Sequence, residues 1–243
     1  MKKTIMTSLF AIGGAFTLNA ATIGVNFVSA GTLPAATSAG FIPAANWTTT
    51  NTLTGSGISV PTNAGTTGAS LTFSSTNANT VGTASAQGDE LLNHGFLFAF
   101  SGSVTASVTF TPAFLIAEPT FATYDAYVYI SANGAWNGSY QANGGTTYYA
   151  TTFSNNGTNY VDNNTGTSFT YNLASSTTSG SPTTGANYVK FTGLTGNFSL
   201  NAAAVGSSTA IVSGFQLVGT VPEVSSAMLG AVGVLALLRR RRA

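Results

Sequence analysis

The sequence predicts an all-β fold, an antiparallel β-sandwich with jelly-roll-like connections, flanked at each end of the chain by an apolar segment. Apolar and polar residues alternate along many short stretches, which is the pattern of strands with one buried and one solvent-facing side. Asn-Gly turns separate these stretches, as at Asn133-Gly134 and Asn156-Gly157. Helical periodicity is almost absent between the two terminal segments. Many short strands joined by such turns are typical of sandwiches and jelly rolls.

Residues 103–110 form the clearest predicted strand, because apolar side chains alternate there with Ser and Thr. Residues 124–130 predict a central strand, since bulky side chains point to both of its faces. The other predicted strands are residues 22–28, the stretch around Leu71 and Phe73, and residues 146–153, 188–191, 197–202 and 211–218. One short helix is predicted at residues 89–94, with Asp89 as its N-cap and Gly95 at its end.

Residues 1–20 have the three parts of a secretory signal peptide. Lys2 and Lys3 precede an apolar stretch at residues 5–18, and small residues follow the end of that stretch. We expect cleavage after Ala20, or one residue later after Ala21. The apolar run is short for a membrane anchor. An exported domain is therefore expected at residues 21–220.

The amino-acid composition limits which classes of partner this exported domain can bind. Only 5% of the chain is charged, against about a quarter in ordinary globular proteins, so its surface must be neutral and polar. Lys190 is the single Lys or Arg within residues 21–220, so no cationic patch can meet phosphates and nucleic acid is excluded as a partner. The chain has no cysteine, so the domain depends on an ordinary core without disulfides.

The C-terminal residues form an apolar segment with a basic end. Residues 224–238 carry no charge and are followed by Arg239, Arg240, Arg241 and Arg242. As a helix, these roughly 15 residues would span about 22 Å, against a hydrocarbon core of about 30 Å. Snorkelling arginines and local thinning of the bilayer allow a transmembrane helix of this length to insert. Because positive flanks stay cytoplasmic, residues 21–220 are predicted to lie outside the membrane.

This C-terminal arrangement resembles the PEP-CTERM sorting signal of Gram-negative bacteria. Val221, Pro222 and Glu223 precede the apolar helix and the arginine cluster, and Val224 stands where the family usually has a second proline. The resemblance assigns residues 221–243 as a sorting signal. It implies export by the Sec translocon, transient anchoring in the inner membrane, processing by an exosortase-type transpeptidase, and delivery to the cell surface or the extracellular space. An anchor that is never cleaved is the alternative.

Motifs within the domain also resemble the exported sandwich domains that are common in PEP-CTERM proteins of the Verrucomicrobia. These motifs lie at residues 23–28, around Trp47, and at residues 124–129, 186–191 and 213–218. The resemblance spans most of the domain and implies a jelly-roll module to which no activity is assigned.

Candidate catalytic groups are few, and we expect that the protein is not an enzyme. His94 is the single histidine, and no Gly-x-Ser-x-Gly nucleophile elbow is present. The acidic residues of the domain are scattered, namely Asp89, Glu90, Glu118, Asp125 and Asp162. A glycoside hydrolase needs two carboxylates that face one another across the scissile bond. A cryptic glycoside or ester hydrolase that uses Asp89 or Asp125 stays open as an alternative.

Residues 162–166 contain one fragment of a calcium loop, with oxygen ligands at Asp162 and Asn164. The closing glutamate of an EF-hand is missing, and Leu173 stands at its position. An Asx-rich turn explains the same residues. The sequence therefore predicts no cofactor, and a structural calcium ion is the alternative.

Two aromatic residues suggest a binding site for carbohydrate. Trp136 lies in a turn-rich loop, where a large apolar ring is unusual, and Tyr140 follows closely. Such rings suit sugars, because the C–H groups of a sugar stack on the ring while its hydroxyls bond at the edge. The alternative is a Trp136 ring that folds back onto the sandwich. We expect a non-catalytic surface or extracellular-matrix protein, associated with polysaccharide or biofilm, and the alternative function is a carbohydrate-binding module.

Overall fold

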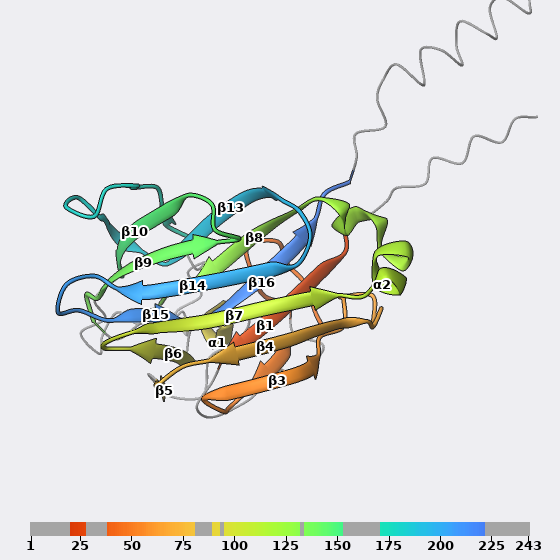
Figure 1. The fold of residues 1–243 in the computed structure, drawn as a ribbon, viewed down its shortest axis with the longest axis horizontal. Helices are drawn as coiled ribbons and strands as arrows, with labels where there is room; N and C mark the ends of the chain where they lie inside the picture. The colour runs from red at the N-terminus through yellow and green to blue at the C-terminus, as the bar shows by residue number, and fades with distance from the viewer. Residues whose placement is uncertain are drawn as a thin grey trace, which may run out of the picture.

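The computed structural model describes residues 20–27, 38–80, 89–92, 95–131, 134–152 and 171–221. These residues are mainly β-strands, and their sheets pack against each other as a β-sandwich (Figure 1). The all-β prediction is confirmed at this level. Within the described ranges, no helix is both long enough and apolar enough to cross a bilayer. The predicted membrane segment at residues 224–238 lies outside those ranges.

The first layer is a six-stranded sheet with the order β11-β13-β8-β16-β1-β2. Its strands, in that order, are Leu173–Ala174, Tyr188–Leu194, Tyr124–Tyr129, Gly214–Gly219, Thr22–Phe27 and Thr48–Thr50. The four central strands pair antiparallel. The two edge pairs, β11 with β13 and β1 with β2, are parallel.

The second layer is a seven-stranded sheet with the order β12-β10-β9-β14-β7-β4-β3. Its strands, in that order, are Thr183–Ala186, Thr147–Thr152, Asn137–Ala142, Phe198–Ala204, Ser103–Phe110, Ala69–Ser74 and Thr54–Ser59. Only the edge pair β10 with β12 is parallel. The antiparallel prediction therefore holds in the centre of both sheets and is wrong at three edges. The partners there are joined by long connections, which parallel pairing requires.

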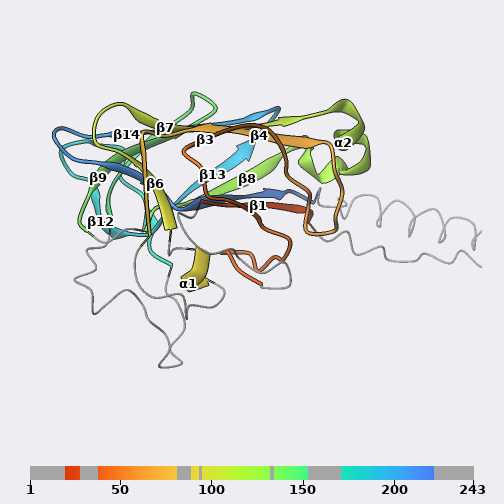
Figure 2. The ribbon, with the colours of Figure 1, turned by 90° about the horizontal axis from the view of Figure 1, so that it is seen from below.

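A third, three-stranded sheet and three short helices complete the described fold. The sheet has the order β15-β6-β5, with β15 at Ala210–Val212, β6 at Gly95–Ala99 and β5 at Asn77–Thr80. The helices are α1 (Asp89–Leu92), α2 (Pro112–Ala117) and the 3₁₀ helix η1 (Pro119–Ala122). Figure 2 shows β14, β7 and β4 in one layer and β1 and β8 in the other, with α1 below them.

The core lies between the two large sheets and follows the predicted alternation. In β7, alternate side chains are buried and more exposed, and β14 and β4 begin with the same pattern. Aromatic pairs join the layers, since the ring centroids of Phe27 and Phe73, and of Phe198 and Phe215, are 5.0 Å apart. The hydrophobic core is therefore made by strands that lie far apart in the sequence.

The outer face of the six-stranded sheet is also covered. Tyr127 and Tyr129 of β8 point to this face, as predicted, and pack in a second cluster with Trp47, which is 6% exposed. The cover is the segment at residues 38–47. The buried Gln216 side chain holds this segment, because its Nε2 donates to the Ile42 carbonyl at 2.6 Å and its Oε1 accepts from the Ile42 N–H at 3.2 Å.

The backbones of β16 and β1 approach each other closely at Gly214, so a larger residue there should destabilise the fold. Gly214 of β16 lies against β1, and a Cβ atom placed on it would clash with the Val25 carbonyl oxygen. Gly214→Ala must therefore push two hydrogen-bonded strands apart. We expect the free energy of unfolding to fall by about 1–3 kcal/mol, measured by urea denaturation.

Gly180→Ala is the matched control. A Cβ atom at Gly180 would meet nothing within 4 Å. Reduced freedom of the unfolded chain should stabilise this variant slightly, by less than about 1 kcal/mol. Equal denaturation midpoints for the two variants would contradict the tight packing of β16 on β1.

Candidate functional site

Trp136 lies just before β9 and is fixed by hydrogen bonds to β10. Its backbone N–H donates to Thr152 Oγ1 at 3.0 Å, and the Thr152 N–H donates to the Trp136 carbonyl at 2.9 Å. Thr152 Oγ1 in turn donates to the Gly134 carbonyl at 2.7 Å. A Cβ atom on Gly134 would lie 2.6 Å from Trp136 Nε1, so any larger residue at this position would have to displace the indole ring.

The Trp136 ring lines a small pocket on the three-stranded sheet. The pocket has a volume of about 130 Å³ and is lined by Phe96, Phe98, Phe100, Trp136, Ile211, Asn79 and Thr209. These lining residues are mostly aromatic or aliphatic, and none is charged. We call this feature the aromatic pocket. Trp136 therefore does pack onto the sandwich, as the alternative interpretation expected, but it also forms one wall of an open site.

Strand alternation in β6 explains how the pocket forms. Leu97 and Ala99 point into the main core, whereas Phe96 and Phe98 point to the opposite face and pack with Ile211. The ring of Phe98 lies 5.8 Å from that of Phe96 and 5.0 Å from that of Phe100, measured between centroids. Phe100 is 58% exposed, which is high for a ring of its size.

The prediction that Tyr140 joins Trp136 in a binding platform is wrong. Tyr140 is 0% exposed and belongs to the main core, with Gly138 and Ala142 buried on the same side of β9. Burial raises the pKa of its hydroxyl. A ring in this position cannot stack on a ligand at the surface. The phenylalanines of β6 are the partners of Trp136 that sequence reasoning missed.

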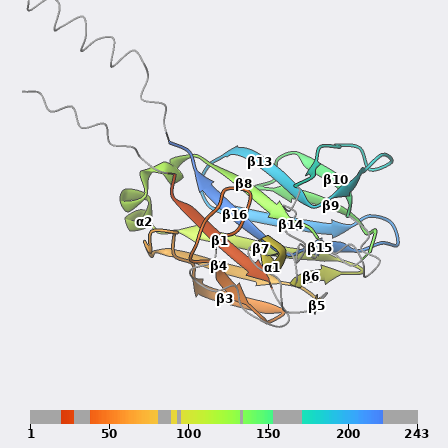
Figure 3. The same ribbon diagram turned by 180° about the vertical axis from the view of Figure 1, so that it is seen from behind.

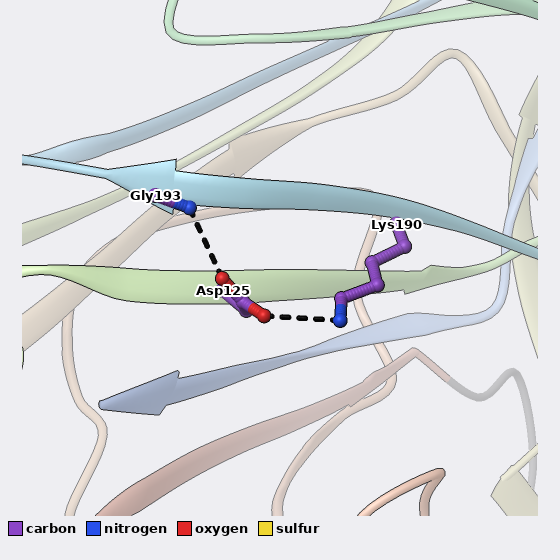
Figure 4. Close-up of polar contacts among 3 residues, drawn as sticks. All are labelled: Asp125, Lys190 and Gly193. Atoms are coloured by element: carbon purple, nitrogen blue, oxygen red, sulfur yellow. Dashed lines mark hydrogen bonds and ion pairs between the residues drawn. The ribbon is translucent and has the colours of Figure 1, made fainter. Parts of the chain in front are cut away.

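Asp125 and Lys190 form an ion pair across neighbouring strands, as Figure 4 shows. Lys190 Nζ lies 3.1 Å from Asp125 Oδ2, and Asp125 Oδ1 accepts from the Gly193 N–H at 3.0 Å. The ammonium also lies 5.1 Å from the centre of the Tyr127 ring. Partial burial disfavours the charge on Lys190, but contacts with Tyr127 and Asp125 outweigh this effect and raise its pKa. Asp125 therefore has a structural role in joining β8 to β13.

Two other acidic residues also hold parts of the fold together. Asp89 was predicted as a helix N-cap, but it is the first residue of α1, and its Oδ1 accepts from the Gly40 N–H at 2.6 Å. Asp89 thus ties α1 to the covering segment. Glu118 Oε1 accepts from the Thr62 hydroxyl at 3.4 Å. Each of these carboxylates has a partner that explains its position.

Other predicted site residues fall outside the described part of the chain. These are Asp162 and Asn164 of the calcium alternative, His94, and Pro222, Glu223 and Arg239 to Arg242 of the sorting signal. Among the described residues, no group of three or more His, Cys, Asp or Glu side chains is arranged to hold a metal ion. Val221 is described and is half-buried at the end of the fold.

Comparisons with known proteins found no match, neither to a protein-family model, nor to a curated protein, nor to a solved structure.

The aromatic pocket suits a neutral and partly apolar group. A dry cavity of about 150 Å³ is known to hold a molecule of benzene size, whereas pockets for whole drug-sized ligands measure about 300–1,000 Å³. At about 130 Å³, the pocket can take one ring or one substituent of a larger molecule. Aromatic walls favour C–H groups, which lie against the faces of the rings.

Buried tyrosines predict that the fold loses stability at alkaline pH. Burial raises the pKa of Tyr129 and of Tyr171, above the ordinary value of about 10. The folded chain therefore keeps protons that the unfolded chain releases. This stabilisation is complete below about pH 10 and is lost as the pH rises above that value.

Urea denaturation at about pH 8 and about pH 11, with tyrosinate absorbance recorded in parallel, tests this prediction. We expect a lower midpoint at the higher pH, and tyrosinate absorbance that rises together with unfolding. Equal midpoints, with all tyrosines ionised in the folded protein, would show that the hydroxyls of Tyr129 and Tyr171 are not buried.

Proposed function

We propose that this protein is an exported, non-catalytic β-sandwich that is sorted by an exosortase-type enzyme to the cell surface or the extracellular matrix. The observation that carries the proposal is the position of the two expected processing points. Cleavage after Ala20 falls before β1, and the sorting motif that starts at Val221 follows β16. Removal of both terminal segments would therefore leave every strand of the sandwich intact.

The pairing of the first and last strands supports this arrangement. β1 and β16 are antiparallel neighbours, with Thr22 opposite Val218, and the Gly219 N–H donates to the Ala21 carbonyl at 2.9 Å. The chain thus enters and leaves the sandwich at one place, as Figure 3 shows from behind. A domain closed in this way can be carried by a terminal anchor and released by a single cut. We also propose that its connections are jelly-roll-like, which the strand pattern supports.

The roles of the acidic residues support a protein without catalytic function. Asp125 is engaged by Lys190 and Gly193, and Asp89 by Gly40. Carboxylates with such structural partners are poorly placed to act as a general acid and base. A hydrolase activity that disappears in Asp125→Asn or Asp89→Asn would overturn this part of the proposal.

The sorting motif can be tested separately from the anchor. Replacing Pro222 and Glu223 by Ala removes the proposed recognition residues, but keeps the apolar segment and the four arginines. We expect this variant to accumulate in the inner membrane with its tail attached, while the unsubstituted protein leaves that membrane. Fractionation and immunoblotting of the native cells measure the difference.

Ser225→Ala with Ser226→Ala is the control, since it changes the same region outside the motif. We expect this control to be sorted normally. Equal release of all three proteins would contradict exosortase sorting.

The aromatic pocket favours a second candidate function, a carbohydrate-binding module. Its walls are neutral and mostly aromatic, and its volume admits one sugar substituent or ring face. The aromatic rings of this site are those of Trp136, Phe98 and Phe100. Tyr140, which the sequence had suggested as the partner of Trp136, is buried and does not take part. A polar domain with few charges is also suited to neutral polysaccharide, because binding to it requires no electrostatic steering.

Trp136→Ala tests this candidate. Stacking on an aromatic ring contributes about 0.5–1.5 kcal/mol beyond its buried area, so we expect roughly two- to twelvefold weaker retention on the polysaccharide of the native cells. Affinity electrophoresis measures the retention. The denaturation midpoint is measured with it, to separate loss of binding from loss of folding.

Leu173→Ala is the matched control, because Leu173 is another large apolar side chain on the surface, 43% exposed, and does not line the pocket. Its retention should be unchanged. Unchanged retention in Trp136→Ala as well would contradict a glycan site at the aromatic pocket.

A further inference from the structure

The helices α2 and η1 carry exposed apolar residues that form one surface. Ile116 is 83% exposed and Leu115 is 38% exposed. The other exposed residues of this surface are Pro112, Ala113, Ala117, Pro119 and Ala122, and all are uncharged. We call this surface the apolar tip. The helix has no acidic residue in its first turn and no basic residue in its last turn.

The opposite side of α2 is already packed, so the exposed side is not a misplaced core face. Thr111 Oγ1 accepts from the Phe114 N–H at 3.1 Å and caps the helix. The Phe114 ring is buried, with its centroid 5.2 Å from that of Phe110 and 5.3 Å from that of Phe121. A surface helix packed in this way normally turns polar residues to water. Ile116 and Leu115 are therefore open to contact with an apolar partner.

The apolar tip lies where the chain leaves the sandwich. The Thr220 N–H and its hydroxyl both donate to the Thr123 carbonyl at 2.8 Å, directly after η1. Gly219 approaches so closely that a Cβ atom on it would lie 2.5 Å from Thr120 Oγ1. In Figures 1 and 3, α2 and the end of β16 lie at the same end of the sandwich. Val221 therefore emerges beside η1.

The length of the following chain places this end of the sandwich near the bilayer. Three Cα steps join Val221 to Val224, where the predicted membrane segment begins, and they reach roughly 10 Å when extended. The predicted helix is also shorter than the hydrocarbon core, about 22 Å against about 30 Å. With the arginines held at the cytoplasmic side, this mismatch draws the attached domain toward the lipid.

We propose that the apolar tip docks into the outer interface of the bilayer while the C-terminal segment is anchored there, with Ile116 and Leu115 among the lipids. This inference rests on the membrane anchor proposed above. The surface is apolar apart from the half-buried Glu118 at the end of α2, whose carboxylate accepts from the Thr62 hydroxyl. Docking therefore depends on burial of the apolar side chains and does not require anionic lipid. The lipid surface thereby fixes the orientation of the sandwich before it is released.

The experiment uses the full chain, reconstituted in vesicles of phosphatidylcholine alone. The protein has no native cysteine, so Ile116→Cys accepts a single environment-sensitive fluorophore. Ser207→Cys carries the same fluorophore in the β14–β15 turn, at the far end of the sandwich (Figure 1). Both positions are exposed, so labelling should not disturb the core.

We expect the fluorophore at position 116 to show a blue-shifted emission and to be quenched by lipids that carry a spin label at headgroup depth. The fluorophore at position 207 should show neither change. A blue shift at position 116 without quenching by lipid would mean that a second copy or another protein covers the tip, and would overturn the proposal.

Sedimentation of the vesicles distinguishes a chain that is anchored in the membrane but does not dock its apolar tip from a chain that is not anchored at all. A chain that sediments with the vesicles, but remains unshifted and unquenched at position 116, would overturn docking and leave the anchor in place. A chain that does not sediment with the vesicles would overturn the anchor, and docking with it.

Discussion

The buried side chain of Gln216 is the interaction on which the outer half of this fold depends. Its amide pairs with both backbone groups of Ile42, and its Oε1 also accepts from the Tyr129 hydroxyl at 3.1 Å. The covering segment is held there over the rings of Tyr127 and Tyr129, on which its own Phe41 and Trp47 rings pack with centroid distances of 4.9 Å and 6.2 Å. Each buried polar group left without a partner costs about 1–3 kcal/mol. The outer face of this sheet carries large side chains that need a cover. Hydrogen bonds from Gln216 to Ile42 hold that cover in place, in addition to hydrophobic packing.

The aromatic pocket and the apolar tip lie toward opposite ends of the sandwich. The aromatic pocket belongs to β6 and β15, and the apolar tip to α2, at the other end of the long axis (Figure 1). In a domain held by its C-terminal segment, the tip would face the lipid and the pocket would face away from it. This arrangement would suit the proposed surface protein, because the pocket would remain open to extracellular polymers. The low charge of the domain is compatible with both proposed contacts, since neither neutral polysaccharide nor zwitterionic lipid requires charged residues for binding.

Strands buried on one face could be predicted from sequence, because burial on one side leaves a period of two, as in β7 and β14. β6 was missed because its aromatic residues pack on one face while Leu97 and Ala99 enter the core on the other, so no polar residue alternates with them. Tyr140 was wrongly predicted as a surface residue because it is close to Trp136 in sequence. Alternation along β9 instead puts Tyr140 on the buried face, together with Gly138 and Ala142. The aromatic pocket also requires the pairing of β6 with β15, a contact between distant segments that no local pattern contains.

Sorting is the central claim, and the intact mass of the mature protein from its native cells tests it most directly. Our account predicts a chain that starts near Ala21 and lacks the residues from about Val221 onward, found outside the inner membrane. A chain that keeps Arg239 to Arg242 and remains in the membrane fraction would contradict sorting. The C-terminal segment would then be a permanent anchor, and the sandwich would be a domain displayed on the membrane.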